Sequence, residues 1–274
     1  TPAGQALTGT PADDSIYGTD GSDTIGYDNP VLNLPPDFLP YDNSGFDLLS
    51  GSYGNDSIYG GRGNDVLDGG AGADTLIGGL ANDTLQGGTG ADSLVGGGDT
   101  AADSGTDDDS LAGGDGNDTL DGGVGNDTLD GGNGDDSLIG GLGNDNLTDS
   151  AGANTLDAGT GDDVLSGVGL LLGGDGNDQL YGGSASSSLD GGSGNDTLSG
   201  SGTLSGGLGS DAIAVNVGFG LGGSGDDTLG TVYYYQGPVN LDGGDGNDVV
   251  NGGVSGDTLA GGLGGDTISG GDGN

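Results

Sequence analysis

The sequence GGDGNDTLD (residues 113–121) begins a stretch in which one nine-residue pattern occurs four times without a gap. GGVGNDTLD (122–130), GGNGDDSLI (131–139) and GGLGNDNLT (140–148) follow it directly. A short fixed period indicates that one unit cannot bury its own apolar side chain and must stack on its neighbours. We number the nine places from the first glycine, so that the aspartate before Thr, Ser or Asn takes the sixth place and the leucine or isoleucine the eighth.

The alternation at the end of each repeat predicts β-strand. The eighth-place residue is flanked by polar residues, which is typical of a strand with one buried side. We expect a positive φ at the glycines of the first, second and fourth places, and the fifth-place Asn or Asp to tolerate the same region. Each repeat is thus predicted to form a turn and a three-residue strand. Two repeats would complete one coil of an all-β, parallel β-roll, a β-solenoid with the Leu and Ile side chains stacked inside.

The charge of the chain requires a partner for this fold. The 274 residues include 73 glycines, every acidic residue is Asp, Arg62 is the only cation, and the net charge is −43. Two carboxylates about 5 Å apart repel by roughly 3 kcal/mol at an effective dielectric constant near 20, and each stacked coil would add that repulsion. The same charge disfavours nucleic acid and anionic membranes. Divalent cations are the expected partners.

Several residue types are missing, and their absence narrows the function. The chain has no His and no Cys, so it lacks the usual general base, the usual zinc ligands and any disulfide. It contains no HExxH or GxSxG motif. No apolar run is long enough to span a bilayer, so we expect no direct membrane insertion. We therefore predict that the chain is not an enzyme.

Breaks in the repeat divide the chain into five expected segments. Four prolines and several aromatic residues interrupt the pattern in the second segment, which we interpret as an insertion or cap. The third segment contains an acidic insertion, residues 98–108, which we expect to be a solvated bulge. The fifth stops at GGDGN, one residue before its aspartate, which suggests a truncated last repeat. The segments are loose repeats at 1–26, the insertion at 27–50, regular repeats at 51–148, a stretch with one degenerate edge at 149–242, and regular repeats at 243–274.

The pattern GGxGxDxUx, with U a large apolar residue, resembles the RTX (repeats-in-toxin) family of calcium-binding β-rolls. GGDGNDTLD (113–121) and GGSGNDTLS (191–199) fit it at every defining place, and the resemblance covers nearly the whole chain. The resemblance implies a right-handed parallel β-roll with calcium held between successive turns. It also implies export from a Gram-negative bacterium by a type I pathway, with folding triggered by external calcium.

The residues themselves suit calcium. Calcium takes six to eight oxygen ligands from carboxylates and carbonyls, whereas magnesium demands stricter octahedral geometry and is less expected. Turns on one edge recur every second repeat, so we expect carboxylates eighteen residues apart to bracket an ion, namely Asp65 with Asp83, Asp74 with Asp92, Asp118 with Asp136, Asp127 with Asp145, Asp178 with Asp196, and Asp248 with Asp266. The predicted ligands of multiple Ca²⁺ ions are Asp14, Asp23, Asp56, Asp65, Asp74, Asp83, Asp92, Asp109, Asp118, Asp127, Asp136, Asp145, Asp163, Asp178, Asp196, Asp211, Asp227, Asp248, Asp257 and Asp266.

The two edges of the predicted roll differ after Thr148. One edge keeps its aspartates, whereas the intervening segments lose theirs until Asp257 and are partly shorter than nine residues. This predicts a tighter, metal-free edge. One hypothesis is that it is an interaction surface; the alternative is that these repeats have drifted and their apolar residues fill the core. The residues concerned are Leu170, Leu171, Leu172, Phe219, Tyr233, Tyr234 and Tyr235.

Together these features predict a secreted calcium-binding structural protein at the cell surface of a Gram-negative bacterium, in a surface layer or extracellular fibre. Calcium would have a structural role, triggering folding and assembly with further copies of the chain, end to end or laterally. One alternative is a non-catalytic RTX module of a secreted protease, lipase or epimerase. Another is an adhesin segment. The varied third place of the repeat argues against a regular ice-binding face.

Overall fold

The computed structural model describes residues 15–17, 46–97, 107–232 and 237–272. All regular secondary structure within these ranges is β-strand. The described residues contain no helix, and hence no helix that could span a membrane. The chain divides into two compact units, Thr1–Asp145 and Asn146–Asn274. Within each unit the strands pair in parallel. The predicted all-β, parallel β-solenoid is confirmed.

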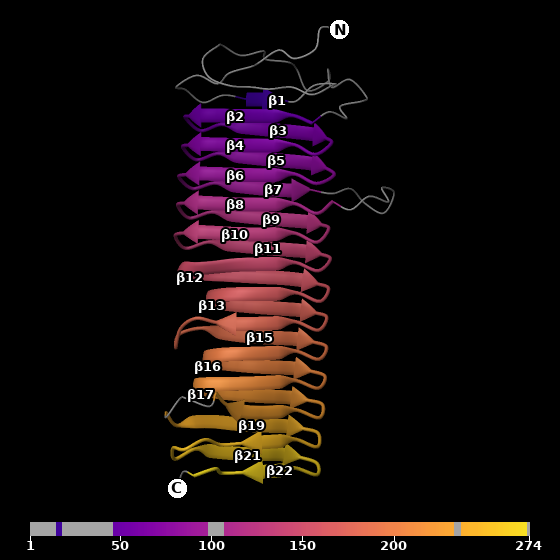
Figure 1. Cartoon of the computed structure of the whole chain (residues 1–274), viewed down its shortest axis with the longest axis vertical. Coiled ribbons are helices and arrows are strands. Elements are labelled where there is room, and N and C mark those ends of the chain that lie inside the picture. The colour runs from indigo at the N-terminus through magenta and orange to yellow at the C-terminus, as the bar shows by residue number, and fades with distance from the viewer. Residues whose placement is uncertain (1–14, 18–45, 98–106, 233–236, 273–274) are drawn as a thin grey trace. The chain divides into compact units, whose positions relative to one another are not determined.

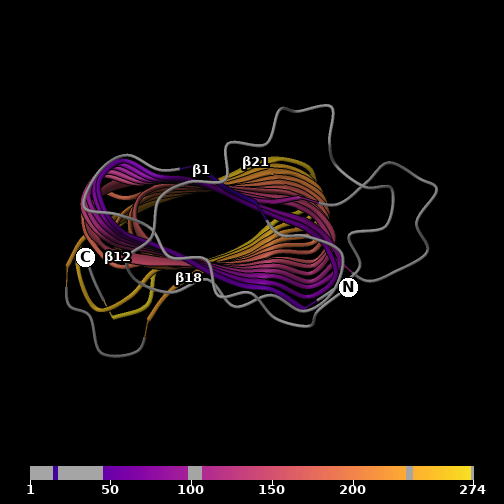
Figure 2. The same cartoon turned by 90° about the horizontal axis from the view of Figure 1, so that it is seen from above.

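The first unit consists of two facing parallel sheets. One sheet pairs β1, β3, β5, β7, β9 and β11, and the other pairs β2, β4, β6, β8 and β10. In Figure 1 the arrows of the two sets point in opposite directions, and in Figure 2 the strands of this unit overlie one another in two layers joined by turns. The strands are β1 Ser15–Tyr17, β2 Leu48–Tyr53, β3 Ser57–Arg62, β4 Val66–Ala71, β5 Thr75–Leu80, β6 Thr84–Thr89, β7 Ser93–Gly97, β8 Ser110–Asp115, β9 Thr119–Val124, β10 Thr128–Asn133 and β11 Ser137–Leu142.

Most strands of the first unit span six residues, so the predicted three-residue strand was too short. Each of the six-residue strands covers places seven to nine of one repeat and continues through places one to three of the next. The glycines therefore belong to the ladder: Gly61 pairs with Gly79, and Arg62 pairs with Leu80. Only places four to six remain as the turn.

The core of the first unit is a stack of eighth-place side chains. Each is at most 1 % exposed and lies in register with the eighth-place residue of the next coil. Burying one such side chain contributes about 1.5–3 kcal/mol. The stacked residues are Leu49, Ile58, Leu67, Leu76, Leu85, Leu94, Leu111, Leu120, Leu129 and Leu138.

The glycines serve two different purposes. Those at the second and fourth places have positive φ, for example 116° at Gly61 and 110° at Gly63, as predicted. First-place glycines do not, and the only described residue other than glycine with positive φ is Ala81, a fourth-place residue, at 76°. The predictions of positive φ at the first and fifth places were therefore wrong. The first-place glycine is required by close approach of oxygen atoms, and the fifth-place residue by its hydrogen bonding, as the next subsection shows.

The coil continues on both sides of the acidic insertion. Leu85 in β6 pairs with Leu111 in β8 just as Leu67 pairs with Leu85, although the sequence separation rises from 18 to 26 residues. At the other end of the unit β2 begins at Leu48, inside the range 27–50 that the sequence assigned to an insertion. The other residues of that range up to Gly45, including its prolines, lie outside the described residues.

The second unit continues the pattern with several longer strands. The middle of a long strand forms a corner, so that its two ends pair in different ladders; β13, for example, pairs with β14 through Val164–Gly167 and with β15 through Leu170–Asp175. The strands are β12 Asn146–Thr160, β13 Val164–Asp175, β14 Gln179–Gly182, β15 Ser188–Ser193, β16 Thr197–Leu208, β17 Ala212–Ser224, β18 Thr228–Thr231, β19 Val239–Asp245, β20 Val249–Asn251, β21 Thr258–Leu263 and β22 Thr267–Ser269.

Candidate metal centre

The sixth-place aspartates form hydrogen-bonded ladders along the edges of each unit. The backbone N–H of Asp65 donates to Oδ1 of Asp83, one coil later, at 2.7 Å. We call such a series an aspartate ladder. In the first unit the ladders are Asp47, Asp65, Asp83, Asp109, Asp127 and Asp145 on one edge, the Asp65 edge, and Asp56, Asp74, Asp92, Asp118 and Asp136 on the other, the Asp56 edge.

The second unit has one such ladder. It joins Asp163, Asp178, Asp196, Asp211, Asp227, Asp248 and Asp266 by N–H to Oδ1 hydrogen bonds of 2.8–3.1 Å. The separation of consecutive members varies between 15 and 21 residues, because the segments between them differ in length. The two aspartates of each of the six pairs predicted to bracket an ion thus lie in adjacent coils. In each pair the backbone N–H of the earlier residue donates to Oδ1 of the later one.

The second carboxylate oxygen, Oδ2, has no donor in many of these turns. These atoms are buried and make no hydrogen bond, and an unsatisfied charged oxygen is costly. Such a cost is removed when a cation occupies the adjoining space. The residues concerned are Asp65, Asp74, Asp83, Asp92, Asp109, Asp118, Asp127, Asp178, Asp196, Asp211, Asp227 and Asp248.

A backbone carbonyl from the next coil approaches the same space. A Cβ atom added to Gly60 would lie 2.6 Å from Oδ2 of Asp65 and 2.7 Å from the carbonyl oxygen of Gly78. A Cβ atom on Gly113 would likewise lie 2.6 Å from the carbonyl oxygen of Gly131 and close to Oδ2 of Asp118. The first-place glycine thus leaves a space at which a carboxylate oxygen and a carbonyl oxygen converge. These are calcium ligands by type, so the residues fit the ion.

Burial makes these carboxylates poor anions without a cation. Desolvation is the main cause that raises the pKa of Asp83 to about 8; a hydrogen bond from the Asp65 amide lowers it in part, and the charges of Asp109, Asp65 and Asp107 act in the same direction as desolvation. Desolvation also raises the pKa of Asp65, Asp109 and Asp178 to about 7. Proton binding and metal binding therefore compete at these turns.

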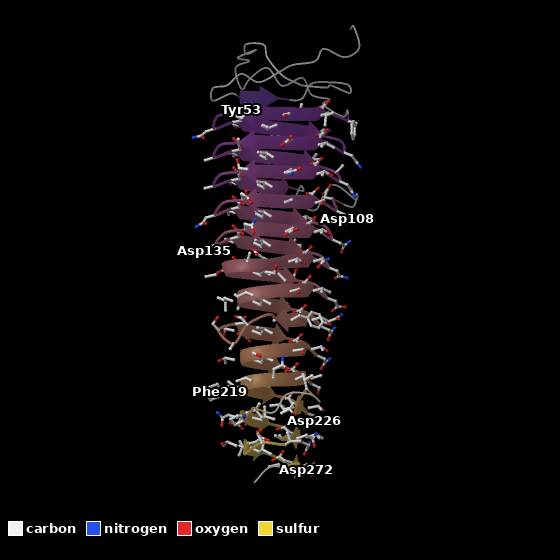
Figure 3. All side chains as sticks on the ribbon, turned by 60° about the vertical axis from the view of Figure 1, so that its left-hand side comes forward. Tyr53, Asp108, Asp135, Phe219, Asp226 and Asp272 are labelled. Carbon is white, nitrogen blue, oxygen red and sulfur yellow. The ribbon has the colours of Figure 1, made fainter. Side chains whose placement is uncertain are left out.

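The fifth-place residues form a second, exposed ladder that runs the other way. The N–H of Asn144 donates to Oδ1 of Asn126, one coil earlier, at 2.8 Å, and the N–H of Asn195 donates to Oδ1 of Asn177 at 2.9 Å. Asn or Asp is needed here as a side-chain acceptor, which the sequence reading did not foresee. Figure 3 shows Asp135 and Asp108, both fifth-place residues, at opposite edges of the first unit.

The described residues include most of the predicted ligands. Asp14 and Asp23 lie outside the described ranges. Asp257 and Asp266 are half-buried, whereas the other predicted ligands in the described ranges are at most 3 % exposed. No three acidic side chains of the described residues are grouped so as to hold a metal ion by themselves. At these turns the further oxygen atoms that could complete a calcium site are the backbone carbonyls described above.

Three buried aspartates, Asp47, Asp107 and Asp149, were not among the predicted ligands. Asp47 is fully buried and begins the ladder of the Asp65 edge, although it falls in the predicted insertion. The segment Asp47, Leu48, Leu49 has the sixth to eighth places of a repeat, which could have revealed it. Asp107 is 4 % exposed and was assigned to a solvated bulge. That prediction was wrong for residues 107 and 108, which are part of a turn of the coil.

The opposite edge of the second unit has neutral residues at the sixth place. A Cβ atom on Gly202 would overlap the carbonyl of Ser187, so this corner has no room for a carboxylate. We call this the neutral edge; its sixth-place residues are Asn154, Gly169, Ser187, Gly202, Gly218 and Val239. On the described part of this edge, the next sixth-place aspartate is Asp257, whose Oδ1 accepts a hydrogen bond from the backbone N–H of Val239 at 3.0 Å.

The residues predicted for an interaction surface fall into three groups. Leu171 is fully buried and stacks in the core in register with Leu156 and Leu189, so its assignment to a surface was wrong. Leu170 and Phe219 are 38 % and 51 % exposed, and Leu172 is half-buried. Phe219 lies on the neutral edge (Figure 3), beside a shallow hollow of about 250 Å³ lined partly by serines. Tyr233, Tyr234 and Tyr235 lie outside the described residues.

A known family matches most of the sequence. A family model described as RTX calcium-binding nonapeptide repeat (4 copies) matches residues 6–28, 41–76, 77–100, 103–138, 139–169, 172–202, 237–259 and 242–274. The chain belongs to this RTX repeat family. The comparison with curated proteins finds no significant match. RTX repeats form a structural calcium-binding fold, in agreement with the buried oxygens described above.

The structure extends the RTX coil beyond the matched residues. The matches leave out residues 203–236, yet β16, β17 and β18 continue the coil through the described part of that range. Asp211 and Asp227 occupy the same ladder as Asp196 and Asp248. The RTX pattern is lost there on the neutral edge, whereas the aspartate edge keeps its buried carboxylates.

Proposed function

We propose that this RTX chain is a secreted structural protein whose coils are held together by multiple calcium ions bound along the aspartate ladders. The observation that carries the proposal is the buried Oδ2 of Asp65 and its equivalents, which has no hydrogen-bond donor and meets a glycine carbonyl of the next coil. Each carboxylate would serve two layers, because Oδ1 faces the preceding coil and Oδ2 faces the following one.

The ion would neutralise the charge of the sixth-place carboxylates and would coordinate their oxygen atoms together with those of nearby backbone carbonyls. On the Asp65 edge the ligands would be the sixth-place carboxylates together with carbonyls such as that of Gly78. On the neutral edge of the second unit, the residues from Asn154 to Val239 would bind no ion. External calcium would then drive folding after secretion, in keeping with the typical occurrence of RTX repeats in secreted proteins.

A ligand titration tests this function. A ligand that binds only the folded state raises its stability in proportion to the logarithm of the ligand concentration. We expect the midpoint of urea unfolding to rise steadily with Ca²⁺, and much less with Mg²⁺ at equal concentration. A midpoint that does not depend on Ca²⁺ would contradict the function. Equilibrium dialysis would count the bound ions.

Self-association forms the second part of the proposal. We propose that copies of the chain associate, end to end or laterally, once calcium has ordered the coils. Sedimentation velocity should show calcium-dependent oligomers; a monomer at all calcium concentrations would exclude assembly.

The exposed side chains on the neutral edge offer a lateral contact. Phe219 is 51 % exposed, and the hollow beside it gives a partner a surface with both apolar and hydroxyl groups. We propose that a neighbouring copy packs there. Phe219→Ser should then reduce lateral association without changing calcium binding. Unchanged association would favour the alternative that the apolar residues of this edge have only drifted.

A further inference from the structure

One turn of the Asp65 edge carries three carboxylates in a row. The four other complete turns of this edge in the described residues have Gly or Ala at the fourth place, Asn at the fifth and Asp at the sixth, as in Gly125, Asn126 and Asp127. The turn that starts β8 has Asp107, Asp108 and Asp109. A Cβ atom on Gly125 would overlap the carbonyl of Asp107, just as one on Gly143 would overlap that of Gly125. Asp107 therefore occupies the fourth place.

The side chain of Asp107 points toward the preceding coil. Its Oδ1 accepts a hydrogen bond from the N–H of Ala81 at 2.6 Å, while Oδ1 of Asp109 accepts from the N–H of Asp83 at 2.7 Å. Oδ2 of Asp83 is buried in the same layer and has no partner. Asp83, Asp107 and Asp109 are 2–4 % exposed. This layer therefore has one buried carboxylate more than a regular layer.

The side chain of Asp108 points toward the following coil. Its Oδ1 accepts from both the backbone N–H and the side-chain amide of Asn126, at 2.7 and 3.0 Å. Oδ2 of Asp109 is buried without a partner, and a Cβ atom on Gly96 would lie close to it and 2.6 Å from the carbonyl oxygen of Gly122. The layer between the turns 107–109 and 125–127 therefore also has an additional negative charge, that of Asp108, which is more exposed than Asp107.

The extra charge is not balanced by the described protein. Arg62, the only cationic side chain of the sequence, is exposed at the end of β3. Because no three acidic side chains of the described residues form a metal-holding group by themselves, the extra carboxylate would act here mainly through its charge. The attraction of a divalent ion for the layer rises with that charge.

We propose that the layer between the turns 81–83 and 107–109 is the tightest divalent-cation site of the first unit, and that the carboxylate of Asp107 makes it so. This inference rests on the proposed function, because it ranks the calcium affinity of one layer above that of neighbouring layers that are also proposed to bind calcium. It also gives the site a role. The paired residues of β6 and β8 are 26 apart in sequence, whereas those of β4 and β6 are 18 apart. Closing a longer segment costs more chain entropy, and a tightly bound ion at the turn 107–109 would offset that cost.

Charge-neutralising variants test the ranking. Asp107→Asn keeps an oxygen that can accept from Ala81 but removes the charge, and Asp108→Asn restores the usual fifth-place residue. Asp135→Asn is the matched control, because Asp135 is an exposed fifth-place aspartate on the Asp56 edge. Calcium binding to the chelator-stripped full chain would be measured by calorimetry with a competing chelator. We expect Asp107→Asn to weaken the tightest class of ions at least about tenfold, and the control to change it less than about threefold.

The outcomes separate this inference from the function on which it rests. A parent chain that binds no calcium would overturn both. A parent that binds calcium with an affinity that Asp107→Asn leaves unchanged would overturn the ranking alone. Hydrogen exchange gives a second measurement that does not depend on the variant. With one equivalent of Ca²⁺, the amides of Ala81 and Asp83 should be protected before those of Ala73 and Asp74 on the Asp56 edge, and simultaneous protection would contradict the ranking.

Discussion

The backbone amide of Asp65 donates a hydrogen bond of 2.7 Å to Oδ1 of Asp83, one coil later, and Oδ2 of Asp83 has no donor at all. Half of the carboxylate is thus satisfied by the protein and half is not. The same arrangement recurs at other aspartates of the ladders, for example Asp74 and Asp178. Under the proposed function, calcium would complete the contact between successive coils at these turns.

Neutralising one member of a ladder should have opposite effects with and without calcium. Asp83→Asn removes a buried charge and keeps an oxygen that can accept from Asp65. We expect it to stabilise the metal-free fold, and to destabilise the calcium-loaded fold by about 1–3 kcal/mol, since the ion in each adjacent layer loses a ligand. Urea unfolding in chelator and in calcium would measure both. Asp135→Asn, at an exposed position, should change either value by less than about 0.5 kcal/mol; a change of the same sign in both conditions for Asp83→Asn would contradict the account.

Adding a methyl group at the first place should close the proposed ion space. In Gly60→Ala the new Cβ would lie 2.6 Å from Oδ2 of Asp65 and 2.7 Å from the carbonyl oxygen of Gly78. We expect a loss of about 2–3 kcal/mol in stability and weaker calcium binding. Gly270→Ala is the control, because a Cβ there meets nothing within 4 Å. Equal effects of the two substitutions in thermal unfolding would argue against a specific space at Gly60.

Protonation of the buried aspartates at low pH should stabilise the metal-free fold in part, as calcium does at neutral pH. The folded, metal-free chain raises the pKa of Asp83 to about 8 and those of Asp65, Asp109 and Asp178 to about 7, above the ordinary value of 3.8. The folded state then binds protons more tightly than the unfolded state, so the stabilisation by protons is complete below pH about 4 and is lost as the pH rises through 7 to 8.

Circular dichroism of the chelator-treated chain against pH would test this, and calcium affinity should change in the opposite direction, increasing from pH 6 to 8. Strand signal without calcium that increases between pH 4 and pH 8 would contradict the sign of the effect.

The sequence predicted the repeat unit and the buried eighth place correctly, because the nine-residue period and the isolated apolar residue leave few alternatives. It did not predict that the first-place glycine is needed for the approach of Asp65 Oδ2 and the Gly78 carbonyl. The sequence predicted that aspartates eighteen residues apart lie in adjacent coils, but it did not show that the strands continue through the first place and bring the glycine carbonyl to the carboxylate. Asp107 was missed because only its alignment with Gly125 and Ala81 shows that it belongs to a turn.

The contrast between the edges of the second unit was also predictable only in part. Loss of the sixth-place aspartates is visible in the sequence, whereas the burial of Leu171 is not, because the segment from Gly169 to Leu172 lacks the usual spacing. The register with Leu156 and Leu189 places it in the core. Shortened repeats lack the regular glycines and aspartate from which the buried eighth place is counted.

The dependence of the fold on divalent cations is most directly tested by far-ultraviolet circular dichroism of the purified chain at pH 7.5, first in excess chelator and then with calcium restored. We predict that strand signal is largely absent in chelator and returns on addition of calcium. An equal strand signal in both conditions would show that the buried carboxylates of the aspartate ladders are accommodated without an ion, and would contradict the account.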